Sequence, residues 1–410
     1  MNDTSVPDEE AASPAGLSST VRTLGAVSFC TDISSEMVYP LNAVFLTRVL
    51  GAPAWTVGLV EGVAETTASL LKLTSGGWSD RFGQRKPFAI AGYSLGALSK
   101  PLIALAGSWG HVLGARFLDR AGKGLRAAPR DALIVENCTP AQRGRAFGLH
   151  RSMDTMGALL GPLLGFWFLR RHPAGFRALY ALAFLPALLG VLLLVFAVQE
   201  KRRAPAAKPE PRTVPRLALP AWNALSASYR RYLLIVALFS LGNSSDAFLV
   251  LRAQSVGASA AQVLLLYALF NSVEATLGYA AGRLSDRVGR LPLLAGGYFV
   301  FALVYLGFAR VNALNAVWGL FAAYGLYSTL TQGVQKAFAA DLAHPQRRGQ
   351  EMGLFHMIVG LAALPASLLA GWLYSHLSSA APFYVGAATA ALASWLLLLM
   401  RQTFKDASAA

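Results

Sequence analysis

The sequence predicts an all-α membrane protein of twelve transmembrane helices in two pseudo-symmetric six-helix bundles. Hydrophobic residues make up 55% of the 410 residues and charged residues 14%, with a mean hydropathy of +0.46; these values are typical of a bilayer protein rather than a soluble domain. A loop pattern, G-x-x-x-D-R-x-G, occurs at 76–83 and again at 282–289, an offset of 206 residues. Each copy separates two apolar segments, which indicates an internal duplication.

Segments of about 20 apolar residues are long enough to cross the ~30 Å hydrocarbon core of a bilayer. The clearest ones, 178–198, 291–309 and 377–400, lack charged residues. Extending from them gives twelve predicted spans: 24–46, 55–75, 87–108, 111–137, 147–169, 178–198, 232–252, 261–282, 291–309, 314–340, 352–374 and 381–400.

The predicted spans divide the chain into two bundles, 21–198 and 232–401. Residues 1–20 are polar and acidic, and we expect a disordered cytoplasmic tail without a cleavable signal peptide. A basic, Pro-rich stretch at 199–231 is the predicted cytoplasmic linker, and 402–410 the second cytoplasmic tail.

The net charge of +15 is concentrated in alternate loops and in the linker. This positive-inside pattern predicts a multi-pass protein of the cytoplasmic (inner) membrane with both termini in the cytoplasm, and it argues against nucleic acid as the partner. Arg170, Arg171 and Arg177 are exceptions, because they follow the fifth span on the outer side. Cys30 and Cys138 are far apart and suggest neither a disulfide framework nor a metal site.

The predicted fourth span carries six charged residues on a single face. At 100° per residue they fall in a stripe about 120° wide. Ionisable groups are costly in lipid, so we expect this stripe to line an aqueous cavity, with the residues from Arg126 onward fitting a cytoplasmic rim equally well. The predicted cavity residues here are Arg116, Asp119, Arg120 and Lys123.

Carboxylates on the first two spans are the candidates for proton coupling. Asp32 and Glu36 are four residues apart and share a helix face, as do Glu61 and Glu65. Such buried carboxylates either carry protons during transport or form fixed ion pairs with the cations of the fourth span. The sequence leaves both roles open.

The second half repeats this plan with fewer charges. Ser244-Ser245-Asp246 echoes Ser34-Ser35-Glu36 at an offset of 210 residues. The predicted cavity residues in this half are Asn243, Asp246, Asn271, Glu274, Gln332 and Gln335, and further ionisable residues within its spans are Arg252, Lys336 and His356.

A second set of residues is expected to control the conformational change. Glu136 and Asp341 end equivalent spans, and we expect them to pair with loop arginines as cytoplasmic latches. His150 and Asp154 follow two arginines and are assigned to the inner gate. From the repeated loops come Asp80, Arg81, Gly83, Arg85, Asp286, Arg287, Gly289 and Arg290.

The fifth span contains Gly157, Gly161 and Gly165, spaced four apart on one helix face, with Pro162 among them. Small residues at this spacing let another helix approach closely, and proline can bend a helix. The stretch is therefore either a hinge or a site of close packing.

These motifs together resemble the major facilitator superfamily over essentially the whole chain. The two G-x-x-x-D-R-x-G copies are similar to its loop 2–3 signature and the echo in loop 8–9. Residues 116–124 look like its fourth-helix signature, departing from it at Asp119 and Arg120, and 157–165 resemble a fifth-helix signature associated with proton-exchanging exporters, departing at Phe166.

The resemblance implies a secondary transporter that moves a small solute by alternating access about a site near the bilayer midplane. Proton-coupled efflux is the first expectation. The alternatives are a proton symporter or facilitator importing an anionic or zwitterionic metabolite or metal chelate, and a non-transporting membrane sensor or scaffold. We expect a monomer with no cofactor and no metal, and no enzymatic activity, whose partners are the solute, protons and the lipid bilayer.

Overall fold

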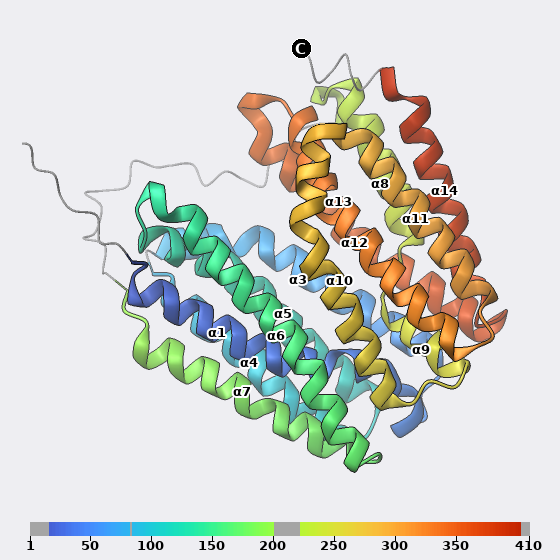
Figure 1. Cartoon of the computed structure of the whole chain (residues 1–410). Coiled ribbons are helices and arrows are strands. Elements are labelled where there is room, and N and C mark those ends of the chain that lie inside the picture. Colours follow the sequence, from blue (N-terminus) through green and yellow to red (C-terminus); the bar gives the residue numbers. More distant parts are fainter. Residues whose placement is uncertain (1–15, 83, 201–221, 403–410) are drawn as a thin grey trace, which may run out of the picture.

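The computed structural model describes residues 16–82, 84–200 and 222–402. In this part of the chain every regular element is a helix, and twelve membrane-length units form two bundles (Figure 1). The N-terminal bundle comprises α1 (Ser19–Glu36), α3 (Ala54–Phe82), α4 (Lys86–Ala104), α5 (Trp109–Glu136), α6 (Arg143–Arg171) and α7 (Phe176–Ala197). The C-terminal bundle comprises α8 (Ala227–Gly242) with α9 (Ala247–Ser255), then α10 (Ala260–Val288), α11 (Arg290–Arg310), α12 (Leu314–Leu342), α13 (Arg348–His376) and α14 (Ala381–Leu399).

Short helical turns connect these units. They are η1 (Tyr39–Leu41), α2 (Asn42–Val44) and η2 (Phe45–Val49) after α1, then η3 (Pro140–Gln142), η4 (Trp222–Ala224) and η5 (Pro345–Arg347). The twelve-span prediction is thus confirmed, although only six of the units are apolar enough to cross a membrane by length and composition alone. The hydropathy of α5 is low because this helix carries charged residues. Two of them, Arg116 and Arg120, are buried inside the bundle.

The first helical unit of each bundle is interrupted at equivalent places. α1 ends at Glu36 before the turns that complete the first span, and the chain between α8 and α9 contains Ser244-Ser245-Asp246. Both copies of the Ser-Ser-acid sequence therefore lie at a helix break. Broken helices within the membrane expose polar groups that solutes and ions can use.

The repeated loop motif lies mostly within helices, which corrects the prediction of a tight loop. α3 continues to Phe82 and α10 to Val288, so the Asp-Arg pair forms the last helical turn in each copy. In the second copy Gly289 ends α10 with φ +95°, a conformation that favours glycine. Gly83, and the side chains of Asp80 and Asp286, lie outside the described residues.

The arginines that broke the charge pattern are held by the ends of helices. The Arg177 guanidinium donates to Ala104 O, at the C-terminus of α4, over 2.6 Å, and also lies over the Phe45 ring. Arg171 stacks on Trp167 with its Cζ 3.5 Å from the ring centroid. A cation near a helix C-terminus is stabilised by the helix dipole. This stabilisation accounts for arginines in a loop where the charge pattern predicts none.

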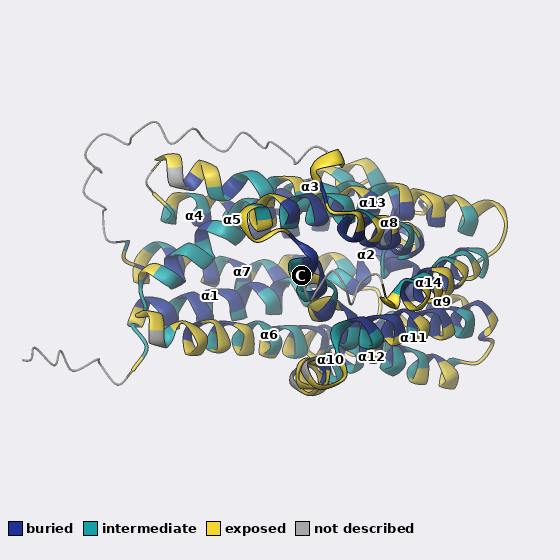
Figure 2. Ribbon diagram, turned by 90° about the horizontal axis from the view of Figure 1, so that it is seen from above, coloured by how far each residue is buried: buried dark blue, intermediate teal, exposed yellow. Residues whose placement is uncertain are grey.

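Glycines set the close helix packing inside the N-terminal bundle. A Cβ added at Gly157 would lie 2.7 Å from Phe29 O, and one at Gly161 would lie 2.7 Å from Ile33 O. α6 therefore packs directly against the α1 backbone. Figure 2 shows the buried residues on the helix faces turned into the bundles, with exposed residues around the outside.

The two bundles meet along α3 with α13 and along α6 with α10. The α3–α13 contacts begin near the helix ends opposite the termini, where Gly371 packs on Trp55, and continue to mid-helix, where Ser69 packs on Gly360. Beyond this point the bundles diverge toward the ends that bear the termini (Figure 1).

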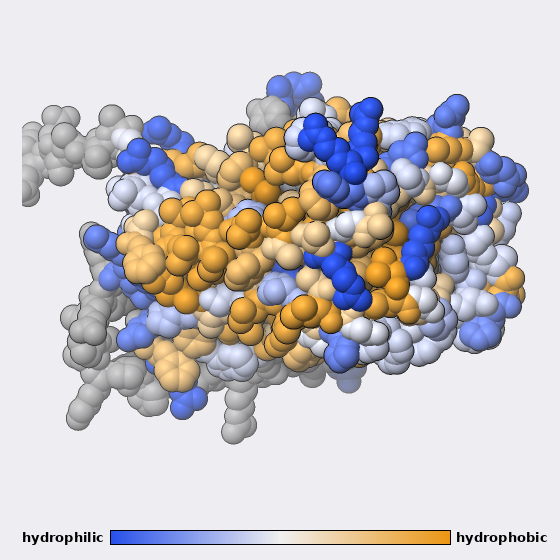
Figure 3. Space-filling view, turned by 90° about the horizontal axis from the view of Figure 1, so that it is seen from below, coloured by the Kyte–Doolittle hydropathy of each residue, from blue (hydrophilic) through white to orange (hydrophobic). Residues whose placement is uncertain are grey.

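An apolar surface surrounds this arrangement. In Figure 3 orange atoms extend across much of one face, with blue groups at its edges and among the orange atoms of its right half. On α7 the exposed apolar side chains include Leu182, Leu185, Leu189 and Phe196. This surface suits contact with lipid.

Candidate functional site

A buried ion pair between α3 and α5 is the centre of the site. Arg116 donates through Nε to Glu61 Oε1 at 3.2 Å and through a terminal nitrogen to Glu61 Oε2 at 2.7 Å. Glu61 is 1% exposed and Arg116 3% exposed. A two-pronged contact of this kind is among the stronger charge-assisted hydrogen bonds.

Asp119 extends the network to α4. It accepts from Arg116 at 3.0 Å and from the Lys100 ammonium at 2.8 Å, and Lys100 also approaches the Ser35 hydroxyl at 3.4 Å. The network thereby connects α1, α3, α4 and α5 through side chains alone.

Arg120 forms a second pair one turn away. Its Nε lies 3.3 Å from Glu65 Oε1. Its Cζ and that of Arg116 each lie 5.2 Å from the centroid of the Tyr39 ring, a distance suited to cation–π attraction. The charges in this network therefore balance. The carboxylates are Glu61, Glu65 and Asp119, and the cations are Arg116, Arg120 and Lys100.

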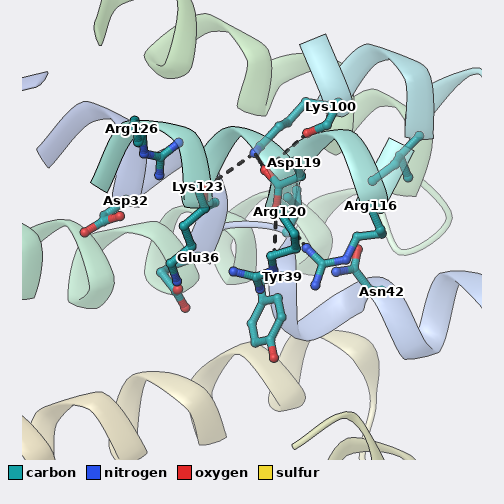
Figure 4. Close-up of a pocket in the computed structure, with 14 residues that line it drawn as sticks. Asp32, Glu36, Tyr39, Asn42, Lys100, Arg116, Asp119, Arg120, Lys123 and Arg126 are labelled. Atoms are coloured by element: carbon teal, nitrogen blue, oxygen red, sulfur yellow. Dashed lines mark hydrogen bonds and ion pairs between the residues drawn. The ribbon is translucent and has the colours of Figure 1, made fainter. Parts of the chain in front are cut away.

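A cavity opens beside this network, between α1, α4 and α5 (Figure 4). Its volume is about 60 Å³, room for a few water molecules but not for a larger solute. Asp32, Glu36 and Lys123 face it, and Figure 4 places Lys123 beside Glu36. Within the described part of the chain neither Asp32 nor Glu36 makes an ion pair or a side-chain hydrogen bond.

The facing wall of the C-terminal bundle is polar and aromatic rather than cationic. At the break between α8 and α9, Asp246 accepts a hydrogen bond from the Tyr324 hydroxyl, and Asn243 Nδ2 donates to the Tyr327 hydroxyl at 3.2 Å. Across the bundle interface the Tyr267 ring packs edge-on against Tyr39 at 6.1 Å. Tyr39 thus lies between the arginines of one bundle and the aromatic wall of the other.

The remaining predicted cavity residues of the second half have different surroundings. Asn271 donates to Ala158 O at 2.9 Å and Glu274 lies 3.7 Å from Arg151, so both residues contact the N-terminal bundle. Gln332 donates to the Ser328 hydroxyl at 2.6 Å on its own helix.

A group of basic residues lies where the α3–α13 interface opens. Thr66 donates to Gly360 O at 3.0 Å, and Ser69 packs on Gly360. Toward the termini, α3 carries Lys72 three residues beyond Ser69, and α13 carries His356 four residues before Gly360. Residues three or four apart share a helix face, so these two side chains extend from the same interface. Lys72 and Lys336 of α12 both lie within electrostatic range of His356.

The two predicted latch residues each pair with a loop arginine. Glu136 lies 2.8 Å from Arg85 and Asp341 lies 2.7 Å from Arg290. Each pair joins helices of one bundle rather than the two bundles. A part for these pairs in gating stays a prediction.

Other predicted gate residues that the structure describes lie on α3, α6 and α10. His150 Nδ1 lies 3.4 Å from Asp154 Oδ2, and both residues belong to α6. The side chains of Arg81 and Arg287 are exposed at the ends of α3 and α10. Gly165 packs against Met37 O, beside the break after α1.

Two central residues were missed by the sequence analysis. Lys100 is a single cation within the otherwise apolar span 87–108 and is 4% exposed. Treating it like the other intramembrane charges would have identified it. Tyr39 gave no comparable signal, because its role depends on where the chain turns after α1.

This architecture, two six-helix bundles around a charged interior with a broken helix in each, defines a polytopic membrane transport protein. The sequence pattern described as Major Facilitator Superfamily matches residues 24–252 and 233–409. The chain belongs to this superfamily, whose members carry small-molecule solutes.

Individual relatives support this assignment. An uncharacterised MFS-type transporter of Methanocaldococcus jannaschii is 36% identical over 392 residues, which cover 94% of this chain and 95% of the relative. The multidrug resistance protein MdtH of Photorhabdus laumondii is 26% identical and covers 82% of each chain. Among solved structures, a POT family transporter in complex with 5-aminolevulinic acid superposes with a TM-score of 0.76 at 13% identity, covering 94% of this chain and 96% of that one. At that identity the likeness shows the fold alone.

Proposed function

We propose that this protein exports a small solute across the cytoplasmic membrane in exchange for protons, working as a monomer with both termini in the cytoplasm. The observation that carries the proposal is the contrast between paired and unpaired carboxylates in the N-terminal bundle. Glu61, Glu65 and Asp119 have cationic partners at 2.7–3.3 Å. Asp32 and Glu36 face the cavity without such a partner in the described chain.

This contrast separates the two roles that the sequence left open. A carboxylate fixed between arginines loses its ion pair when it is protonated, so protonation there is costly. A carboxylate that faces a small hydrated cavity can gain or lose a proton without breaking a salt bridge. Glu36 is therefore our first candidate for the proton carrier and Asp32 the second, and Glu61 and Glu65 are assigned to structure.

Glu36 also has a counterpart in the second bundle. Asp246 occupies the equivalent helix break and accepts from Tyr324. Both carboxylates adjoin the interface between the bundles, where Tyr39 contacts Tyr267. A change of charge at Glu36 would thus act on the surface that must rearrange during alternating access.

The direction of transport is inferred from two features. One relative is named a multidrug resistance protein, and residues 157–165 of this chain resemble an exporter signature. The bundles diverge toward the termini, so this conformation would receive solute from the cytoplasm.

We infer that the transported solute is anionic or zwitterionic with an aromatic body and that it binds between the bundles, beside the small cavity, which itself holds only a few water molecules. Lys72 and Lys336 supply positive charge close to His356, and Lys123 does so near Glu36. On the other side the rings of Phe270 and Tyr324, 5.4 Å apart, provide an aromatic surface.

Proteoliposomes with an internal pH dye test the proposal. An imposed pH gradient is combined with pooled anionic, zwitterionic and cationic aromatic solutes, and the dye reports solute-dependent proton flux. We expect one pool, anionic or zwitterionic, to trigger flux that is lost in Glu36→Gln and kept in Asp131→Asn, whose partly exposed pair with Arg130 lies outside the cavity. Solute movement without any proton flux would overturn the antiport mechanism and favour a facilitator.

A further inference from the structure

A second hollow lies on the face opposite the two termini, apart from the charge network. It is a groove of about 370 Å³ between the bundles. The N-terminal bundle contributes Thr47 and Arg48 from η2, and the C-terminal bundle contributes Leu251, Gln254 and Ser255 from α9 and Tyr374 from α13. The groove therefore crosses the contact that closes this end of the molecule.

Two groups in the groove lack partners. Arg48 is exposed and makes no ion pair within the described residues. Gln254 is 7% exposed, yet its Nε2 has no hydrogen-bond partner there. A buried amide without a partner destabilises a fold, and a ligand that accepts its hydrogen bond removes that cost.

The position of Gln254 is fixed by its neighbour Arg252. The Arg252 guanidinium donates to Phe308 O at 2.9 Å, to Val311 O at 2.8 Å and to the Ser379 hydroxyl at 2.9 Å. These bonds tie α9 to the ends of α11 and α13. The C-terminal wall of the groove is thus held in place, and only a small movement of the Gln254 side chain is needed for its amide to meet a ligand.

The opposite wall has an unusual backbone. η2 is a single π-helical segment, Phe45–Val49, that carries Arg48 outward. Isolated π-helical turns are rare and are frequent at functional sites. Between the two walls, Leu251 and the Tyr374 ring provide apolar surface.

We propose that this groove binds a small organic anion with an apolar body, and that the bound anion holds the outer ends of the bundles together. Its carboxylate or phosphate group accepts hydrogen bonds from the Arg48 guanidinium of one bundle and from the Gln254 amide of the other. The apolar body lies on Leu251 and Tyr374. The inference depends neither on the transported solute nor on proton coupling.

Binding of benzoate to the protein in phosphatidylcholine nanodiscs, measured by isothermal titration, tests the site. Benzamide, the neutral analogue of the same shape, is the ligand control. We expect benzoate to bind the unmodified protein and Arg310→Gln, an exposed outer arginine away from the groove. Affinity should fall at least tenfold in Arg48→Gln and in Gln254→Leu, and at least tenfold from benzoate to benzamide.

Equal binding of benzoate and benzamide would overturn the proposal, as would unchanged benzoate affinity in the two groove variants. The benzoate and benzamide comparison uses the unmodified protein, so it stands even if a variant fails to fold. Size-exclusion chromatography and circular dichroism identify such a variant.

A distance measurement tests the consequence for the outer ends. Spin labels are placed by Leu105→Cys and Leu377→Cys, which are 82% and 63% exposed, in a Cys30→Ala/Cys138→Ala background. Benzoate should shift the distances toward the shorter population, and Arg48→Gln should abolish the shift. Distances that ignore benzoate overturn the bracing role.

A lipid phosphate could supply the same anionic chemistry, and nanodiscs containing phosphatidylglycerol distinguish the two sources. If this lipid shortens the distances by itself and prevents benzoate binding, the anion site is supported and its natural occupant is the headgroup. If benzoate binding is unaffected by the lipid, a soluble anion is the occupant.

Discussion

Arg116 on α5 holds Glu61 on α3 through two hydrogen bonds, of 3.2 and 2.7 Å, in an interior where each residue is at most 3% exposed. Removing one member of such a pair leaves the other charge buried without its partner. This is more damaging than removing both members, because the penalty comes from the uncompensated charge. The pair therefore makes a sharp prediction about stability.

Glu61→Gln should destabilise the protein by about 3–5 kcal/mol, the cost of breaking a buried ion pair from one side. Glu61→Gln/Arg116→Gln should be less destabilised than the sum of the two single variants. Thermal unfolding followed by tryptophan fluorescence measures both effects. Asp131→Asn is the control, because its pair with Arg130 is much more exposed, with side chains 46% and 21% exposed, and is expected to be worth about 0–1 kcal/mol. Equal losses in Glu61→Gln and Asp131→Asn would show that the network is not structural.

Gly161 provides a packing prediction within the N-terminal bundle. A Cβ there would lie 2.7 Å from Ile33 O and 2.9 Å from Met37 N, and neither backbone atom can move aside cheaply. Gly161→Ala should cost about 1–3 kcal/mol by overpacking. Gly148→Ala on the same helix has no atom within 4 Å of the new Cβ and should be neutral or slightly stabilising, since alanine favours helix. Thermal unfolding of the two variants tests this prediction, and equal unfolding midpoints would contradict the packing argument.

The architecture was predictable from the sequence because a bilayer demands long apolar helices and the duplication is visible in the repeated loops. The residues at which the helices end were not predictable in this way. The Asp-Arg pairs of the repeated motif continue α3 and α10 by a turn, since a helix that emerges from lipid can keep its backbone hydrogen bonds while its side chains are solvated. Hydropathy therefore placed the predicted ends of these spans several residues too early.

For the site, helix periodicity placed the charged residues of α5 on one face but could not identify the residues with which they pair. Glu61 and Glu36 are equivalent by sequence pattern, yet one meets Arg116 and the other faces a cavity. The difference arises from the rotation and depth of α1 and α3 relative to α5, which depend on glycine contacts between helices. Tyr39 was missed for the same reason, because it reaches the arginines only through the break after Glu36.

Arg252 yields a prediction about the outer end of the second bundle. Its guanidinium donates hydrogen bonds to three carbonyl oxygens near the end of α11, at 2.9 Å for Phe308, 3.3 Å for Ala309 and 2.8 Å for Val311. Lysine has the same charge but not the planar fork that reaches all three. Arg252→Lys should therefore lose about 1–3 kcal/mol by leaving buried acceptors unsatisfied.

Thermal unfolding measures this loss, with Arg310→Lys as the matched control on an exposed arginine of the same region. If Arg252→Lys unfolded at the same temperature as Arg310→Lys, the charge alone would account for the role of Arg252.

Gly58 tests the interface that closes the outer end. A Cβ at this position of α3 would overlap Ser367 O on α13, so the two helices cannot keep their contact in Gly58→Ala. This contact joins the two bundles, whereas the contact of Gly161 lies within one bundle. Gly58→Ala should therefore shift the conformational equilibrium toward separated outer ends while each bundle stays folded.

The labels at positions 105 and 377 report this shift as longer distances, together with a nearly unchanged unfolding temperature. Gly77→Ala, on the same helix but with no atom within 4 Å of the new Cβ, should retain the original distances. Because alternating access requires the outer ends to close again after release of solute, Gly58→Ala should also slow solute-dependent proton flux in proteoliposomes. Unchanged distances in Gly58→Ala would mean that the α3–α13 contact adapts to a side chain, and the outer closure would then have to depend on other contacts, such as those between α2 and α9.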